Sequence, residues 1–203
     1  MLYIFDEVDS IEDGFLESVV ALLSEERCAK MMRLRTPLKK KASAIAYLLL
    51  RLALSDVYGI EEVVEFDYIE KGKPVLRNYP HIHFNLSHSN SAVACVVSDV
   101  PVGVDVQHIA PISDKVARRV LTGDEYGKFK ESRIPDEYFC EIWTTKESFL
   151  KKTGQGISVD LRDLSADSLV EKTIYRGRDY ICCATGSNVK IKHVGRGDIE
   201  RSY

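Results

Sequence analysis

The sequence predicts an α/β protein built from two similar halves. Apolar residues recur at helical spacing over residues 41–58, and this segment ends at Gly59 and leads into a strand-like region. The same order returns over residues 137–152, where a second helix ends at Gly154 or Gly156 and again leads into a strand-like region. A helix, a glycine stop and a strand therefore occur twice, which indicates two related α/β units.

The strands that follow these helices are predicted at residues 63–69 and 157–161, and a further core strand is predicted at residues 180–184. The chain has no Ser/Gly-rich linker, low-complexity segment or long block of charge. We therefore expect a first half over residues 1–100 and a second half over residues 101–203, which together form one unit.

The middle of the chain has the pattern of three short strands. Residues 81–88 alternate between polar and apolar, residues 92–97 are apolar, and residues 103–107 alternate again. In the last of these, Asp105 and Gln107 would share one face of the strand. We expect the three strands to form a meander.

That meander would bring polar residues together at one end. The turn after the first strand is rich in hydrogen-bond donors and begins with Ser87 and His88. Adjacent pairing of the strands would place both residues near Asp105.

The second helix carries charges next to its apolar face. Its buried stripe is predicted to consist of Phe139, Ile142, Trp143, Phe149 and Leu150. Lys146 falls inside this stripe, and Glu147 and Lys151, four residues apart, lie on its flank and can reach a cleft beside the core. The alternative is a surface ion pair, with Lys146 extending its ammonium group to water.

Composition limits the class of protein. The chain has 203 residues and a formal net charge of −3, which argues against nucleic acid as the main partner. No apolar run is long enough to span a bilayer, and the first residues lack the pattern of a secretion signal. The five cysteines contain no C-x-x-C pair and are interpreted as reduced thiols. We expect a cytoplasmic protein with no membrane partner.

Four motifs occur in the order and spacing of one known family. In chain order they are Gly72-Lys73-Pro74, Asn85-Leu86-Ser87-His88-Ser89, Gly103-Val104-Asp105-Val106-Gln107 and the helix from Trp143 to Lys151. With these motifs, the region between residues 73 and 156 resembles the surfactin-type 4'-phosphopantetheinyl transferases. The chain departs from the family pattern at Gln107, where the family usually has a carboxylate.

The resemblance implies a pseudo-twofold pair of α/β subdomains with the active site in the cleft between them. It also implies a metal site at Asp105 and Glu147, to which Gln107 would add an amide oxygen, directly or through water. Because Mg²⁺ prefers oxygen ligands and keeps several waters, one or two carboxylates and substrate phosphates suffice to bind it. Glu147 would act as the general base, and Lys151 would neutralise charge on the pyrophosphate.

The other substrate, coenzyme A, carries a 3'-phosphate that calls for basic residues. The resemblance implies that Lys73, Ser87 and His88 bind coenzyme A, together with Lys151. A basic segment of the first half adds candidates, among which we single out Lys40, although such a segment is more often a solvated face. Its members are Lys30, Arg33, Arg35, Lys39, Lys40 and Lys41.

The implied reaction moves the 4'-phosphopantetheine arm of coenzyme A to a serine of an acyl- or peptidyl-carrier protein and releases adenosine 3',5'-bisphosphate. Two alternatives remain: a non-catalytic carrier-binding protein whose metal site has decayed at Gln107, and a metal-dependent hydrolase of nucleotide pyrophosphates. Glu125 matches a position linked to activity in the family, but a carboxylate that stabilises the start of a helix explains it better. Both halves lie in one chain, so we expect a monomer.

Overall fold

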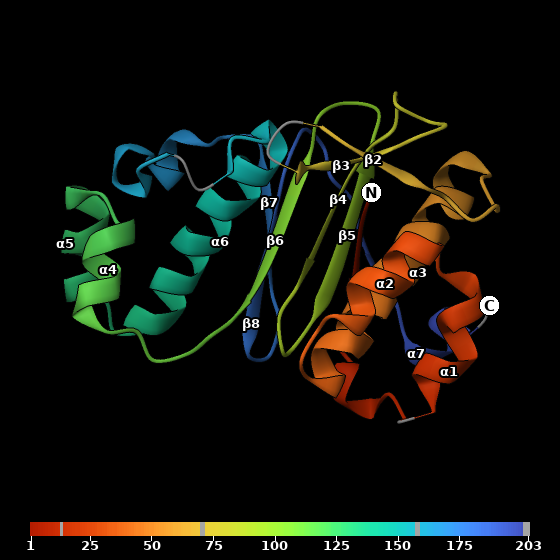
Figure 1. Cartoon of the computed structure of the whole chain (residues 1–203). Helices are drawn as coiled ribbons and strands as arrows, with labels where there is room; N and C mark the ends of the chain where they lie inside the picture. Colours follow the sequence, from red (N-terminus) through yellow and green to blue (C-terminus); the bar gives the residue numbers. More distant parts are fainter. Residues whose placement is uncertain (13, 70–71, 157–158, 201–203) are drawn as a thin grey trace.

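The computed structural model describes residues 1–12, 14–69, 72–156 and 159–200, which form strands and helices in two groups (Figure 1). The strands are β1 (Leu2–Phe5), β2 (Phe66–Tyr68), β3 (Pro74–Leu76), β4 (His83–His88), β5 (Val93–Ser98), β6 (Gly103–His108), β7 (Lys172–Arg176), β8 (Tyr180–Thr185) and β9 (Ile191–His193). The α-helices are α1 (Phe15–Val19), α2 (Glu25–Met32), α3 (Pro37–Tyr58), α4 (Asp114–Val120), α5 (Gly123–Glu131), α6 (Pro135–Thr153) and α7 (Arg196–Glu200). The 3-10 helices are η1 (Val8–Ser10), η2 (Val20–Leu22), η5 (Leu161–Asp163) and η6 (Ala166–Ser168).

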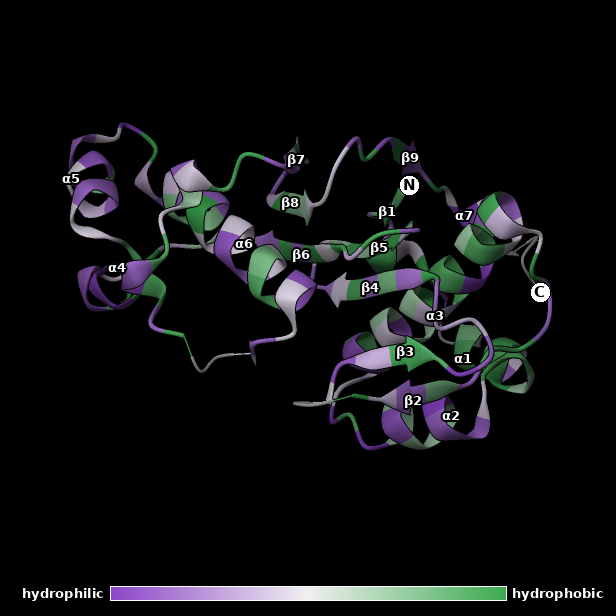
Figure 2. Cartoon of the chain, turned by 90° about the horizontal axis from the view of Figure 1, so that it is seen from above, coloured by the Kyte–Doolittle hydropathy of each residue, from purple (hydrophilic) through white to green (hydrophobic). Residues whose placement is uncertain are grey.

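Two sheets form the centre of the molecule, and each carries one long helix on its outer face. The first sheet has the strand order β4-β5-β1-β9, the second has the order β6-β8-β7, and β2 and β3 form a separate hairpin. Helix α6 packs on β6 and β8, whereas α3 packs on β4 and β5. Figures 1 and 2 show α4, α5 and α6 on one side of the strands and α1, α2, α3 and α7 on the other.

The two halves have the same topology. In the first half, β1 is followed by α3 and then by the hairpin β4–β5, whose second strand pairs antiparallel with β1. In the second half, β6 is followed by α6 and then by the hairpin β7–β8, whose second strand pairs antiparallel with β6. The α/β fold class is therefore confirmed, and the repeat seen in the sequence corresponds to a repeated arrangement of strand, helix and hairpin.

The end of the described chain returns to the first half. After β8, strand β9 pairs parallel with β1, with Tyr3 opposite Lys192. Ile199 of α7 is fully buried in the core that α3 forms with the first sheet. The division of the chain at residue 100 remains a prediction, but the segment 191–200 packs on the first sheet.

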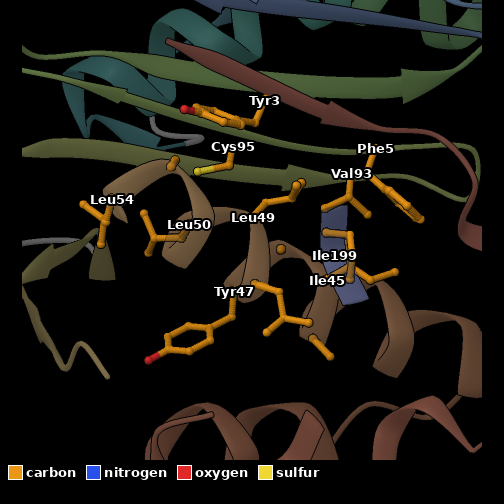
Figure 3. Close-up of a cluster of buried hydrophobic side chains, with 14 of the residues drawn as sticks. Tyr3, Phe5, Ile45, Tyr47, Leu49, Leu50, Leu54, Val93, Cys95 and Ile199 are labelled. Atoms are coloured by element: carbon orange, nitrogen blue, oxygen red, sulfur yellow. The ribbon is translucent and has the colours of Figure 1, made fainter. Parts of the chain in front are cut away.

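Alternation along the strands separates the apolar side chains into layers. In β1, Tyr3 and Phe5 face α3, and Leu2 and Ile4 belong to the cluster shared by the two sheets. Figure 3 shows how α3 fills the space beneath the first sheet. The labelled side chains are Tyr3, Phe5, Ile45, Tyr47, Leu49, Leu50, Leu54, Val93, Cys95 and Ile199. Burial of such side chains contributes about 1.5–3 kcal/mol each to the stability of the fold before conformational entropy is counted. This core therefore holds α3 against the first sheet.

The predicted strand over residues 157–161 is wrong in the part that is described. Leu161 begins the 3-10 helix η5, and the Asp160 side chain accepts a hydrogen bond from the backbone N–H of Arg162 (2.9 Å). This local cap turns the chain away from an extended conformation. Residues 157 and 158 lie outside the described residues.

The predicted three-stranded meander is also wrong, because β6 pairs with β8 and not with β5. Strands β4 and β6 still lie against each other. Asn85 Oδ1 accepts a hydrogen bond from the N–H of Val104 (3.0 Å), and Ser87 Oγ accepts one from the N–H of Val106 (3.2 Å). The seam between the two sheets is therefore bridged by side chains of β4, which supply the acceptors that a neighbouring strand would otherwise provide.

The position of α6 depends on a glycine in β6. A Cβ atom at Gly103 would lie 2.0 Å from the carbonyl oxygen of Ser148 and 2.5 Å from the backbone nitrogen of Lys152. No side chain fits in this space, so the strand and the helix backbones touch directly.

Gly103→Ala is expected to lower the free energy of unfolding by about 1–3 kcal/mol, because the added methyl group forces α6 away from β6. The measurement is chemical denaturation. Gly127→Ala is the matched control, since a Cβ atom at Gly127 meets nothing within 4 Å; in an exposed helix, alanine should stabilise by about 0.5–1 kcal/mol. Equal stability of the Gly103→Ala variant and the wild-type protein would contradict the close packing.

Candidate active site

A cavity of about 370 Å³ opens where β4, β6 and α6 meet. Its lining residues come from both halves of the chain and are Leu86, Ser87, His88, Asp105, Gln107, Trp143, Glu147, Lys151 and Leu161. A second cavity, of about 210 Å³, adjoins it and shares Leu86, Glu147 and Lys151 with it. The cleft formed by the two cavities is the candidate active site. It is lined by seven of the eight residues proposed from the sequence for metal binding, catalysis or coenzyme A binding, and Lys40 is the one that lines neither cavity.

Asp105 is the most connected side chain of the cleft. It is only 2% exposed, and its Oδ1 accepts hydrogen bonds from Ser87 Oγ (2.9 Å) and Lys151 Nζ (2.6 Å). Its Oδ2 accepts a hydrogen bond from Gln107 Nε2 (2.9 Å). A buried carboxylate with an ammonium and two neutral donors is well compensated for its loss of water. The predicted closeness of Ser87, Gln107 and Asp105 is therefore confirmed, although the strand pairing differs.

Glu147 is a half-buried carboxylate that lines both cavities. Burial raises its pKa, the nearby negative charge of Asp105 raises it further, and the ammonium of Lys151 acts in the opposite direction. Within the described part of the chain, Glu147 makes no side-chain hydrogen bond or ion pair. Its oxygens are therefore open to a ligand or to a proton from a substrate.

The donor set of the cleft fits a hard cation with phosphate co-ligands. Asp105 and Glu147 both present carboxylates to one cavity, and their mutual repulsion favours a positive charge between them. Among the described residues there is no cluster of three or more His, Cys, Asp or Glu side chains that could bind a metal alone. Two carboxylates would thus need further oxygens from water or substrate, which is the usual situation for Mg²⁺.

Gln107 contacts Asp105 through its amide nitrogen. Because an ionised carboxylate can only accept hydrogen bonds, the amide must turn its NH₂ group toward Asp105. The amide oxygen then lies on the other side of the same group. The structure thus places Gln107 in the cleft as a donor to Asp105, and its predicted contact with a metal stays a prediction.

The residues proposed to bind coenzyme A take different positions. Ser87 Oγ also accepts from Lys151 Nζ (3.0 Å), and His88 lies at the exposed end of β4 in the larger cavity. Lys73 lines the smaller cavity, but its ammonium donates to the backbone carbonyls of Lys151 and Lys152 (both 2.8 Å). Four of these five residues thus meet in the cleft, and hydrogen bonds already orient the side chains of Lys73, Ser87 and Lys151.

Lys40 is not joined to the cleft by any hydrogen bond or ion pair among the described residues. Instead, Arg27 and Lys39 act on the cleft, through His88. Partial withdrawal from water lowers the pKa of His88, and the charges of Lys151, Arg27 and Lys39 lower it further. Arg27 and Lys39 therefore contribute positive potential at the edge of the cleft.

Sequence reasoning missed Arg27, which is 8% exposed in α2. Its Nη2 donates to the carbonyl oxygen of Ser43 (3.2 Å), and its guanidinium lies 5.8 Å from the ring centroid of Phe66. The available signal was its spacing from Met31: residues four apart share one helix face, and Met31 is buried.

Comparison with known proteins gives one consistent result. A sequence model of the 4'-phosphopantetheinyl transferase superfamily matches residues 101–197. The chain is 34% identical over 154 residues to 4'-phosphopantetheinyl transferase psf-1 of Bacillus pumilus, which covers 74% of this chain and 66% of that protein. It is 31% identical over 152 residues to 4'-phosphopantetheinyl transferase Sfp of Bacillus subtilis (strain 168), with coverage of 73% and 68%.

A third relative extends the alignment. The 4'-phosphopantetheinyl transferase gsp of Aneurinibacillus migulanus is 28% identical over 206 aligned positions, which cover 91% of this chain and 84% of that protein. The match to the Bacillus pumilus protein spans about two thirds of that relative's length. The similarity thus includes all four motifs that line or approach the cleft.

A second buried charge pair lies outside the cleft. Lys146 is 0% exposed, so the interpretation that its ammonium reaches water is wrong. It donates to Glu125 Oε2 (2.5 Å) and to the backbone carbonyls of Val120 (2.8 Å) and Leu161 (2.9 Å). Burial lowers the pKa of Lys146, and Glu125 opposes this shift.

Glu125 has a structural position, as the helix-start interpretation predicts. It forms a capping box with Thr122 at the start of α5, in which Glu125 Oε2 accepts from the N–H of Thr122 (2.8 Å). Its Oε1 accepts from the N–H of Ala166 (2.8 Å). One carboxylate thus ties α5, α6 and η6 together.

Lys146→Met is expected to lower the free energy of unfolding by about 3–5 kcal/mol, because Glu125 would keep a buried charge without its partner. Denaturant unfolding gives the value. Adding Glu125→Gln, which removes the charge and keeps a side chain able to cap α5, should restore part of the loss. If the double variant is as unstable as the sum of the two single variants, the two groups are not coupled.

Proposed function

Because this chain belongs to the 4'-phosphopantetheinyl transferase superfamily, we propose that it transfers the 4'-phosphopantetheine arm of coenzyme A to a serine of an acyl- or peptidyl-carrier protein. Adenosine 3',5'-bisphosphate is the second product. The observation that carries the proposal is the meeting of Asp105, Glu147 and Lys151 in one cavity, which also receives Ser87 and His88 from the other half.

Asp105 and Glu147 are the residues that would hold Mg²⁺. When bound, this ion would supply positive charge to the pyrophosphate and help to orient it. Both carboxylates line the same cavity, and the pKa of Glu147 is raised by its burial and further by the charge of Asp105. The Lys151 ammonium donates to Asp105 Oδ1 at 2.6 Å. When Mg²⁺ and coenzyme A are bound, this ammonium would be shared between the Asp105 carboxylate and the substrate phosphates.

The transfer forms one bond and breaks one. The serine oxygen of the carrier attacks the phosphorus that bears the pantetheine arm, and the P–O bond to the adenosine-side phosphate breaks with its electron pair on the leaving oxygen. Glu147 accepts the serine proton; its raised pKa and open oxygens suit this task. The Lys151 ammonium stabilises the charge that develops on the phosphate oxygens.

The nucleotide end of coenzyme A is assigned to the edge of the cleft near β4. His88 lies there, and Lys39 and Arg27 add positive charge around it. A phosphate dianion is attracted to such a group of cations. Lys39 is therefore a better candidate for the 3'-phosphate than Lys40, which makes no hydrogen bond or ion pair with the cleft within the described chain.

The decisive experiment uses intact-protein mass spectrometry. Apo forms of several acyl- and peptidyl-carrier proteins are incubated with the purified enzyme, coenzyme A and Mg²⁺, and the added arm is sought on the carrier. A carrier with its acceptor serine replaced by alanine is the control and should stay unmodified. Cleavage of coenzyme A without carrier would indicate the hydrolase, and coenzyme A binding without transfer to any carrier would indicate the non-catalytic binding protein.

A single chain is proposed to suffice, because both halves of the cleft come from it. Sedimentation of an active monomer supports this, and activity confined to a trimer contradicts it. The five cysteines are free thiols, in keeping with a reducing compartment such as the cytoplasm. In the described part of the chain no helix is long and apolar enough to cross a membrane.

Asp105→Ala is expected to abolish transfer at every Mg²⁺ concentration, because it removes the carboxylate to which Lys151, Ser87 and Gln107 all donate. Gln107→Glu is expected to lower the Mg²⁺ concentration for half-maximal rate, since a second acid beside Asp105 increases the demand for a cation. Both values come from metal titrations of initial rate.

Two comparisons sharpen this test. Asp124→Ala, at an exposed position in the first turn of α5, should leave the titration unchanged. Gln107→Ala removes the hydrogen bond to Asp105 without adding a negative charge. It should therefore not lower the Mg²⁺ concentration for half-maximal rate. Near-normal turnover of Asp105→Ala would show that the metal is bound elsewhere.

A further inference from the structure

Lys73 reaches across the cleft from the first half to the end of α6. Its Nζ donates to the carbonyl oxygens of Lys151 and Lys152, at 2.8 Å each, and these residues are 78 and 79 positions away in the sequence. The side chain is half-buried, and a Cβ atom at Gly154 would lie 3.6 Å from Lys73 Cδ. The lysine stem thus lies along the helix end while its charge meets the final carbonyls.

This contact has a clear physical basis. The last carbonyls of a helix lack partners within the helix and carry a partial negative charge. An ammonium group held against them satisfies two acceptors and complements the helix dipole. Helices α3 and α6 both end at a glycine with left-handed backbone angles, Gly59 and Gly154. At the end of α3, the Gly59 N–H donates to the carbonyl oxygen of Ser55 (3.0 Å), so the acceptor is satisfied by a neighbouring residue. At the end of α6, in contrast, a side chain from the other half takes part.

The backbone carbonyl that Lys73 holds belongs to Lys151, whose own ammonium contacts Asp105 and Ser87. One turn earlier on the same helix is Glu147. A shift of the end of α6 would therefore move both side chains relative to Asp105. Gly103 allows the helix to approach β6, and Lys73 contacts the same end of the helix from the first half.

We propose that Lys73 is a positioning residue, which fixes the C-terminal turn of α6 and thereby places Lys151 and Glu147 for the transfer, rather than a cation whose main partner is a coenzyme A phosphate. Two of the three hydrogens of its ammonium are already used by the helix end. The lowering of its pKa by burial is consistent with a cation that faces protein. This inference rests on the proposed transferase function.

Steady-state kinetics separate the two roles. Lys73→Met is expected to lower kcat by about 10-fold to 100-fold, because a small displacement of reacting groups is costly, while the KM for coenzyme A changes less than about twofold. Lys73→Arg keeps a charged donor of similar length and should recover most of kcat. A phosphate-binding role predicts the reverse for Lys73→Met: a KM for coenzyme A raised about 10-fold or more, with kcat retained. That result would overturn the proposal.

Lys172→Met is the matched control. Lys172 also donates its ammonium to a backbone carbonyl, that of Ala166 (2.5 Å), but it lies in β7 outside both cavities. Its replacement should leave kcat and the KM for coenzyme A as in the wild-type enzyme. If Lys73→Met fails to fold, Lys73→Gln, which can still donate hydrogen bonds, provides the same comparison with a smaller loss of kcat.

Hydrogen exchange tests the contact without any substrate. Amides over residues 149–154 should exchange faster in Lys73→Met than in the wild-type protein and in Lys172→Met, and unchanged exchange would overturn the proposal. This measurement also separates the two hypotheses. If the wild-type protein modifies no carrier, the proposed function fails, yet faster exchange in Lys73→Met would still establish Lys73 as the residue that fixes α6.

Discussion

The seam between β4 and β6 is the constraint on which the rest of the site depends. Two edge strands meet there without a backbone ladder, and buried N–H groups must still find acceptors. Asn85 and Ser87 provide these acceptors for Val104 and Val106. A serine hydroxyl is also a donor, and Ser87 Oγ donates its hydrogen to Asp105 Oδ1. The packing of the two halves therefore determines where the central carboxylate of the cleft lies.

The charges of the cleft are arranged unevenly around this seam. Asp105 has three donors, whereas the neighbouring Glu147 has no side-chain partner among the described residues. Inside a protein, an uncompensated carboxylate next to a compensated one attracts either a proton or a cation. The two acids of the cleft therefore differ before any ligand binds. Asp105 is held in place by its hydrogen bonds, whereas the Glu147 carboxylate is accessible to a proton or a cation.

Sequence periodicity predicted which residues share a face but not which elements become neighbours. The alternation of residues 103–107 correctly placed Asp105 beside Gln107, and the four-residue spacing correctly brought Glu147 and Lys151 to one cleft. The partner of β6 could not be predicted, since β8 lies more than 70 residues away and offers the same apolar pattern as β5. Pairing of this kind is decided by the whole core, not by the strand itself.

Single charged residues show the same limit. The position of Lys146 on the buried stripe was visible in the sequence, but the capping carboxylate and two carbonyls that compensate its charge come from separate segments. Likewise, a lysine in a Gly-Lys-Pro turn gives no sign that its acceptors are on a helix nearly 80 residues later. The partners that compensate a buried charge can come from distant segments, and the sequence around the charged residue gives no sign of them. Reasoning from the local sequence therefore predicts that such a side chain contacts water or a ligand.

The return of β9 to the first sheet has a consequence for the order in which the molecule can be completed. During synthesis β1 emerges first, but its parallel neighbour β9 begins only at Ile191. Until then, one edge of β1 has unpaired backbone groups, which are prone to associate with other chains. The second half must therefore be synthesised before the first sheet can close, and the two halves, although alike in topology, mature as one interdependent body.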